Sequence, residues 1–339
     1  MVGSVAGMLR WLLLRVYRIP PTPTNPTPAE LELTAEDVEL TAVDGTALRG
    51  WFLPAAPGGG EPGVAVVVLH GWGSAASDLL PAAPGLVAAG VSVLLIDVRG
   101  HGRSDAVDFM SMPRFAEDLE AAVGWLRADP RIDPDRIGVI GHSVGAGACL
   151  LAASRDPHLA AVVAIAAMAH PAELIRSSRG LRSAPASFAT RVLVTIEDTI
   201  GHRFDAFAPI NTIRGIAAPV VVLHGDDDTT VPPRDAARLV DAAGGTARLR
   251  LVPGAGHRAI SPFLPLVEEL ATFLQRALSD PGRPVGGRTR AHTGGGLASR
   301  HPSGRSWCLP CTASAPRCSS LGSGGWVSTC ACTGPSTSP

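Results

Sequence analysis

A serine flanked by glycines is the first feature of the sequence with a clear chemical use. Residues 141–145 are Gly-His-Ser-Val-Gly, a G-x-S-x-G motif centred on Ser143. The apolar run Gly138 to Ile140 precedes the motif, and a helix-like stretch follows it. In such a setting a tight turn exposes the serine oxygen at the N-terminal end of a helix, where partial positive charge stabilises a developing anion. The pattern therefore predicts Ser143 as a nucleophile.

A serine hydroxyl is a weak nucleophile at neutral pH, so it needs a general base, and the base needs an orienting acid. His257 lies in a glycine-flanked loop between an apolar run and the last helix-like stretch. Residues 226–228 are three consecutive aspartates that follow an earlier apolar run. We expect His257 to be the base, and the residues alone leave the acid open among the three aspartates.

The elements that must position these residues follow from the hydrophobic periodicity. Short apolar runs predict strands, and the longer amphipathic segments between them predict helices. The expected strands span Val38–Ala42, Ala47–Leu53, Val64–Leu69, Val91–Ile96, Ile137–Ile140, Leu159–Ala167, Pro219–Leu223 and Ala247–Val252. The expected helices lie near residues 75–89, 113–128, 144–155, 233–243 and 261–278. Buried strands that alternate with helices predict an α/β fold whose mainly parallel sheet is covered on both faces.

The order of the chemical residues along the chain is also informative. A serine, then an acid, then a histidine, each just after a strand, is the order typical of the α/β-hydrolase superfamily, which residues 31–279 resemble. The resemblance implies that the acid is Asp228, the fifth residue of an H-G-x-x-D-x-x-V-P pattern. It implies that the backbone N–H groups of Trp72 and Val144 form the oxyanion hole. The D-x-R-G-x-G-x-S segment at 97–104 is expected to have a structural role.

One connection between expected strands is too long for a simple crossover. The chain between His170 and Ala218 carries no expected strand, and a structureless loop of this length is uncommon in a compact domain. We therefore expect extra helices at about 171–218, which form a small lid over the strand ends. The domain interpretation is an α/β-hydrolase domain at 31–279, flanked by residues 1–30 and 280–339.

The first 30 residues divide into an amphipathic segment and a proline-rich spacer. On a helical wheel of residues 1–19, Arg10, Arg15 and Arg18 fall within one arc. The apolar residues opposite them are Leu9, Leu12, Leu13, Val16 and Ile19. This pattern is typical of a helix that contacts a membrane peripherally, and also of a terminal helix packed on the body. Residues 20–28 are expected to form an extended spacer that holds the body clear of such a membrane.

The last segment, 280–339, differs in composition from the rest of the chain. It is rich in Gly, Ser, Thr and Pro and lacks a hydrophobic period, so we expect a disordered tail, whose composition resembles a reading-frame artefact. The Cys308 and Cys311 pair lies there without the flanking elements of a thioredoxin-like redox motif. Of the six cysteines, only Cys149 precedes residue 300. This usage indicates a reducing compartment and a cytoplasmic protein, membrane-associated if residues 1–19 bind lipid.

The motifs favour a serine hydrolase that cleaves carboxylic esters of small acyl molecules through an acyl-enzyme. A serine peptidase or acylaminoacyl hydrolase is the enzymatic alternative, and a non-catalytic binding protein on the same scaffold is the other. A net charge of −1 gives no indication of a nucleic-acid partner, and no motif indicates a metal or an organic cofactor. The hydrophobic content of 46% supports a packed globule.

The amphipathic segment generates a prediction about membranes. We expect the full-length protein to co-sediment with anionic vesicles, and less so as salt rises, because each Arg near anionic lipid contributes about 1 kcal/mol. A chain that lacks residues 1–28 is the comparison. Equal partitioning of the two chains would exclude a tether, and salt-insensitive pelleting of the full-length chain alone would indicate insertion.

Overall fold

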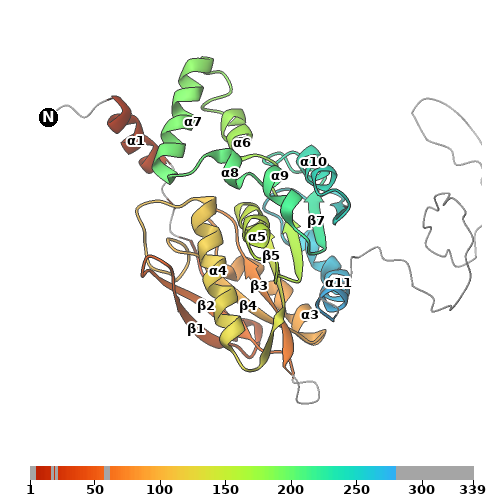
Figure 1. Cartoon of the computed structure of the whole chain (residues 1–339). Helices are drawn as coiled ribbons and strands as arrows, with labels where there is room; N and C mark the ends of the chain where they lie inside the picture. Colours follow the sequence, from red (N-terminus) through yellow and green to blue (C-terminus); the bar gives the residue numbers. More distant parts are fainter. Residues whose placement is uncertain (1–4, 17–18, 20–21, 57–61, 280–339) are drawn as a thin grey trace, which may run out of the picture. The chain divides into compact units, whose positions relative to one another are not determined.

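A central sheet of eight strands organises the computed structural model, which describes residues 5–16, 19, 22–56 and 62–279. The strands are β1 (Glu36–Thr41), β2 (Ala47–Leu53), β3 (Gly63–Leu69), β4 (Val91–Asp97), β5 (Ile132–His142), β6 (Ala161–Ile165), β7 (Val220–Gly225) and β8 (Ala247–Val252). Their spatial order is β1-β2-β4-β3-β5-β6-β7-β8 (Figure 1). Only β2 runs antiparallel to its neighbours, so the mainly parallel sheet is confirmed. The tail at 280–339, with its Cys308 and Cys311, lies outside the described residues.

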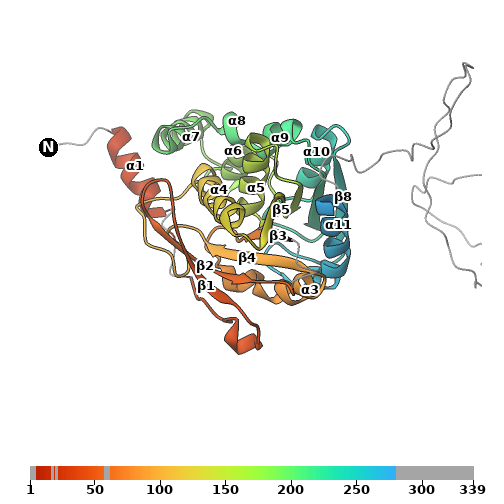
Figure 2. The ribbon, with the colours of Figure 1, turned by 60° about the horizontal axis from the view of Figure 1, so that its bottom comes forward.

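Helices cover both faces of this sheet. α4 (Met112–Ala128), α5 (Val144–Arg155) and α10 (Arg234–Ala242) pack on one face, and α3 (Ala83–Ala88) and α11 (Val267–Ser279) pack on the other. Figures 1 and 2 show the strands between these two sets of helices. Because both faces are covered, a central strand such as β4 is buried along its whole length. This double burial explains its continuous apolar sequence.

Prolines shorten two of the expected helices. The stretch near 261–278 begins as a 3-10 segment, Ser261–Leu266, and α11 starts only at Val267. Residues 75–89 likewise divide into α2 (Ala76–Leu79), the 3-10 turn Leu80–Ala82 and α3. A proline ring removes an N–H donor and clashes with the preceding turn, so apolar periodicity overestimates helix continuity at such positions.

Four helices form the lid expected at about 171–218. Between β6 and β7 the chain folds into α6 (Pro171–Ser177), α7 (Ala186–Ile200), α8 (Phe204–Phe207) and α9 (Pro209–Thr212), followed by the 3-10 turn Ile213–Gly215. Phe204 and Phe207 of α8 are buried in the same apolar core as α4 and α5. The lid is therefore anchored to the body at α8.

The N-terminal helix α1 (Val5–Val16) packs against α7 of the lid. Leu13 contacts a small apolar cluster of Leu181, Ala189 and Val192. Both views show the two helices side by side (Figures 1 and 2). Packing on the body, one of the two interpretations of the amphipathic pattern, thus describes α1 in the structure. Contact with a membrane stays a prediction, and none of the described helices has the length and apolar character that crossing a bilayer requires.

The proline-rich segment differs from the expected free spacer. Ile19 packs on the main core, and the Thr22 hydroxyl accepts a hydrogen bond from the Gly102 N–H. The Pro23 carbonyl accepts from the Ser77 hydroxyl at 3.4 Å. Residues of an extended segment have no internal hydrogen bonds, so their polar groups are free to pair with the body. The expectation that this segment holds the body clear is therefore wrong for its described part.

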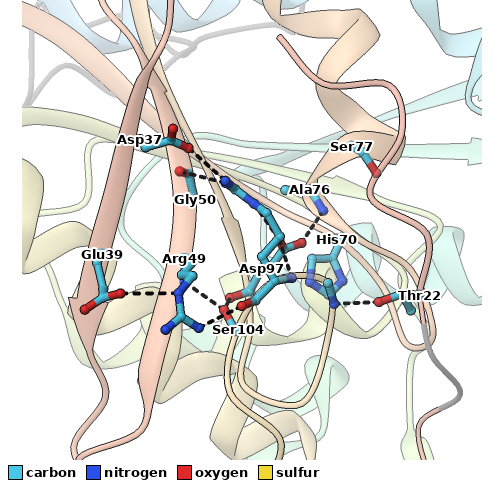
Figure 3. Close-up of polar contacts among 12 residues, drawn as sticks. Thr22, Asp37, Glu39, Arg49, Gly50, His70, Ala76, Ser77, Asp97 and Ser104 are labelled. Carbon is cyan, nitrogen blue, oxygen red and sulfur yellow. Dashed lines mark hydrogen bonds and ion pairs between the residues drawn. The ribbon is translucent and has the colours of Figure 1, made fainter. Parts of the chain in front are cut away.

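The loop after β4 is fastened by the buried carboxylate of Asp97 (Figure 3). One oxygen accepts from the Ala76 N–H at 2.8 Å, and the other accepts from the Arg103 N–H at 3.1 Å. The Ser104 hydroxyl donates to the Asp97 carbonyl and accepts from the Arg49 N–H. These bonds join the loop at 97–104 to β2 and to the start of α2. The segment has the structural contacts that its sequence pattern implies.

Arg99 of the same loop is the largest fully buried side chain among the described residues. Its Nε donates to Asp118 at 2.7 Å, and its terminal nitrogens contact Asp44 at 2.6 Å and Glu117 at 3.1 Å. Burial raises the pKa of Asp118 to about 6, although the hydrogen bonds and charge of Arg99 lower it. The guanidinium therefore compensates a carboxylate that water does not reach.

This pairing leads to a stability prediction. Arg99→Met should lower the free energy of unfolding by about 3–5 kcal/mol, because it leaves the buried Asp118 without its partner. Arg131→Met is the matched control, since Arg131 is 45% exposed and its partner Glu36 is 46% exposed. Such a change should cost about 1 kcal/mol or less. Urea unfolding at pH 7 measures both, and equal losses would contradict the assigned importance of Arg99.

Candidate active site

Ser143 lies in the sharp turn between β5 and α5. Its backbone has φ 54° and ψ −117°, a conformation that residues other than glycine rarely adopt. Its N–H donates to the Ile165 carbonyl at 2.8 Å, which holds the turn against β6. The turn places the side chain at the N-terminal end of α5 and at the carboxyl edge of the sheet, as the G-x-S-x-G pattern predicts.

The two glycines of the motif are required by close backbone approach. A methyl group on Gly145 would lie 2.3 Å from the His70 carbonyl oxygen, and one on Gly141 would lie 2.4 Å from the Gly145 carbonyl oxygen. Neither backbone oxygen can retreat cheaply, because each belongs to a packed segment. The glycines let the end of β3 approach the serine turn, and Gly71 accordingly lies beside Ser143.

Ser143, His257 and Asp228 form a continuous chain of hydrogen bonds. Ser143 Oγ lies 2.9 Å from His257 Nε2, and His257 Nδ1 lies 2.7 Å from Asp228 Oδ2. A carboxylate only accepts, so Nδ1 carries the proton of the neutral ring and Nε2 presents its lone pair to the serine hydroxyl. The arrangement can draw the proton from the serine oxygen as that oxygen attacks.

The structure separates the three consecutive aspartates. Asp228 is buried at 4% exposure and contacts His257. Asp226 and Asp227 are exposed, and Asp226 accepts from the Gly254 N–H at 2.7 Å. Asp228, the aspartate that the family pattern selects, is therefore the one beside the histidine.

Asp228 is surrounded by donors. Burial raises its pKa, but hydrogen bonds from His224, His257 and the Val231 N–H outweigh burial, so the pKa lies well below its ordinary value. The N–H groups of Thr230 and Val231 both donate to Oδ1 at 2.8 Å. The group is ionised at neutral pH. Its contribution to stability is present above its unfolded-state pKa and is lost only as the pH falls through the lowered folded-state pKa.

Trp72 and Val144, the residues expected to supply oxyanion donors, come from two different elements near the serine. Val144 is the first residue of α5, and Trp72 follows Gly71 in the loop after β3. Both line the cavity that contains Ser143. The Trp72 ring also stacks on Phe115, with ring centroids 6.4 Å apart. The ring thus packs on the core and faces the cavity at once.

His142, the residue before the serine, supports the loop of His257. Its Nε2 donates to the His257 carbonyl at 2.8 Å, because a carbonyl oxygen can only accept. Burial lowers the pKa of His142 to about 4, so this ring is neutral at pH 7. His142 thus holds the loop that carries the catalytic candidate His257.

The serine opens into an apolar cavity of about 800 Å³. Its walls come from the loop before α4, the lid helices α6, α7 and α8, and the N-terminal helix α1. Apolar lining residues include Leu13, Leu14, Phe109, Met168, Leu174, Ile175, Ile196, Ile200, Phe204 and Phe207. Leu13 and Leu14 were not expected in the site, and no sequence signal distinguishes them from the other leucines of α1. Within the described residues, no cluster of His, Cys, Asp or Glu side chains is suited to a metal ion.

Known proteins share this architecture. The family model described as serine aminopeptidase, S33, matches residues 60–208. The uncharacterized protein Rv2307c of Mycobacterium tuberculosis is 33% identical over 259 residues, which cover 76% of this chain and 85% of the relative. The uncharacterized protein YfhR of Salmonella typhimurium is 30% identical over 234 residues, which cover 69% and 76%.

A solved structure extends the comparison. The esterase Pf2001 of Pyrococcus furiosus superposes with a TM-score of 0.61 at 25% identity, over 77% of this chain and 97% of the esterase. The family-model match includes the serine turn between β5 and α5. The chain therefore belongs to the α/β-hydrolase superfamily and is a hydrolase.

Proposed function

We propose that this hydrolase cleaves carboxylic esters through an acyl-enzyme, with Ser143 as nucleophile, His257 as general base and Asp228 as the orienting acid. The observation that carries the proposal is the hydrogen-bonded chain of 2.9 and 2.7 Å that ends at a serine facing an apolar cavity. A buried, ionised Asp228 holds the histidine in the tautomer that accepts a proton at Nε2.

The proposed reaction proceeds in two balanced halves. Ser143 Oγ bonds to the acyl carbon while its proton moves to His257 Nε2, and the carbonyl oxygen becomes an anion near the N–H groups of Val144 and Trp72. The bond to the leaving alcohol then breaks, and His257 returns the proton to that alcohol. Water repeats the sequence on the acyl-enzyme and releases the acid. No step needs a metal or a redox group.

The family description raises an aminopeptidase as the alternative. An enzyme of that kind needs a carboxylate to bind the ammonium group of its substrate. Among the lining residues only Asp78 carries one, and its Oδ2 already accepts from the Ser74 hydroxyl and from the Ala75 N–H at 3.1 Å. The remaining walls are largely apolar and suit an acyl chain better than a charged terminus. The Pyrococcus protein is an esterase, which supports the same choice.

The nucleophile is tested by covalent labelling and turnover. Wild-type protein should react with a fluorophosphonate probe and hydrolyse p-nitrophenyl butyrate faster than an aminoacyl p-nitroanilide. Ser143→Ala should lose labelling and about 10⁴-fold or more in ester turnover, with its melting temperature little changed. A folded wild type that does not label would favour a non-catalytic scaffold, and faster cleavage of the anilide would favour the peptidase.

The acid is tested by two neighbouring substitutions. Asp228→Asn should lower kcat by about 10⁴-fold, because the amide no longer stabilises the Nδ1–H tautomer of His257. Asp227→Asn is the matched control, since Asp227 is exposed and lies one residue away. It should keep nearly wild-type kcat toward the same ester. A similar kcat in both variants would remove Asp228 from the proposed role.

A further inference from the structure

Two leucines of the N-terminal helix belong to the wall of the catalytic cavity. Leu13 and Leu14 of α1 line the same cavity as Ser143, although the two leucines are far from the serine in the sequence. Other side chains of the helix face away, because Trp11 is 59% exposed and Leu12 is 48% exposed. α1 therefore presents one pair of adjacent residues to the cavity and another to solvent.

Contacts on both sides of the wall hold α1 in this place. Leu13 packs against Ala189 and Val192 of α7 and against Leu181, which precedes that helix. After the helix, Ile19 packs on the main core and Thr22 bonds to Gly102. A 12-residue helix is marginal in water without such packing. Its position beside α7 (Figure 1) is thus determined by the lid and by the loop after β4.

The chemistry at Ser143 orients a substrate within this cavity. The leaving alcohol takes its proton from His257, so it must lie on the histidine side. Arg258, which follows the histidine and also lines the cavity, is polar and exposed. The acyl group must then extend the other way, toward the apolar walls of α6, α7 and α1. Ile196 and Ile200 of α7 stand in the same lining as the two leucines.

We propose that Leu13 and Leu14 are specificity-determining residues, which complete a site for the far end of a long, unbranched acyl chain. An aliphatic wall stabilises a methylene chain by removing it from water and offers nothing to a polar or charged acyl group. A short acyl group would leave this part of the cavity unfilled. The inference rests on the proposed ester hydrolysis and adds the substrate class, long-chain acyl esters, and the helix that selects it.

The test compares neighbouring substitutions in the full-length protein. The readout is the ratio of kcat/KM for p-nitrophenyl decanoate to that for p-nitrophenyl butyrate. The Leu14→Trp ring would occupy the cavity space that takes the end of the acyl chain. It should lower this ratio at least about tenfold, since single methylene contacts already change specificity by about that factor. Leu12→Trp is the matched control: a leucine two positions away changes to the same bulky residue on the exposed face of α1, and the ratio should stay at the wild-type value.

A second variant keeps the inference testable if Leu14→Trp does not fold. Leu14→Ala adds no bulk and should lower the ratio about threefold or more through lost contact with the chain end. It decides the question if Leu14→Trp shows no cooperative melting. An unchanged ratio in the folded Leu14 variants of an active enzyme, or an equal fall in Leu12→Trp, would overturn the inference and leave ester hydrolysis standing. A wild type that hydrolyses neither ester would instead overturn the proposed function.

Discussion

The turn at Ser143 depends on backbone segments that approach each other too closely for any side chain. Gly145 lies against the end of β3, and Gly141 lies against the first turn of α5. The positive φ of Ser143 is a strained conformation that costs on the order of 1–3 kcal/mol, and it persists only where its surroundings hold it. The bond from Ser143 N–H to β6 and the buried sheet on either side supply that support. His257 bonds to the serine that this turn presents, and the cavity lined by the lid contains that serine.

Two buried aspartates show how local donors decide the charge of a carboxylate. Asp118 and Asp228 are both shielded from water. Burial wins at Asp118, whose pKa rises to about 6 despite its bonds to Arg99. Hydrogen bonds win at Asp228, where two histidines and backbone N–H groups lower the pKa. The difference matters because a neutral acid beside His257 would no longer stabilise the imidazolium that forms when the ring takes a proton.

Much of this architecture could be predicted from the sequence, because strands that are covered on both faces have continuous apolar sequences. The serine turn and the glycine-flanked His257 loop also carry local patterns. The choice of Asp228 as the acid needed the family pattern, since the sequence alone does not distinguish three adjacent aspartates. The cavity wall at Leu13 and Leu14 could not be predicted, because a helical wheel places Leu14 among the arginines and Leu12 on the apolar face, whereas Leu14 lines the cavity and Leu12 is 48% exposed. The proline-rich segment misled for a related reason, since composition does not show where unpaired polar groups will bond.

The origin of the cavity wall has a consequence for comparing members of this family. The span that matches the family model, residues 60–208, contains the serine turn but not α1. A relative that aligns over that span shares the nucleophile and can differ in the wall. Residues 5–16 thus add to the cavity wall from outside the matched span, beside the lid helices α6, α7 and α8 that lie within it. Exchange of residues 5–16 between relatives offers a route to new chain-length preferences that leaves every strand of the sheet untouched.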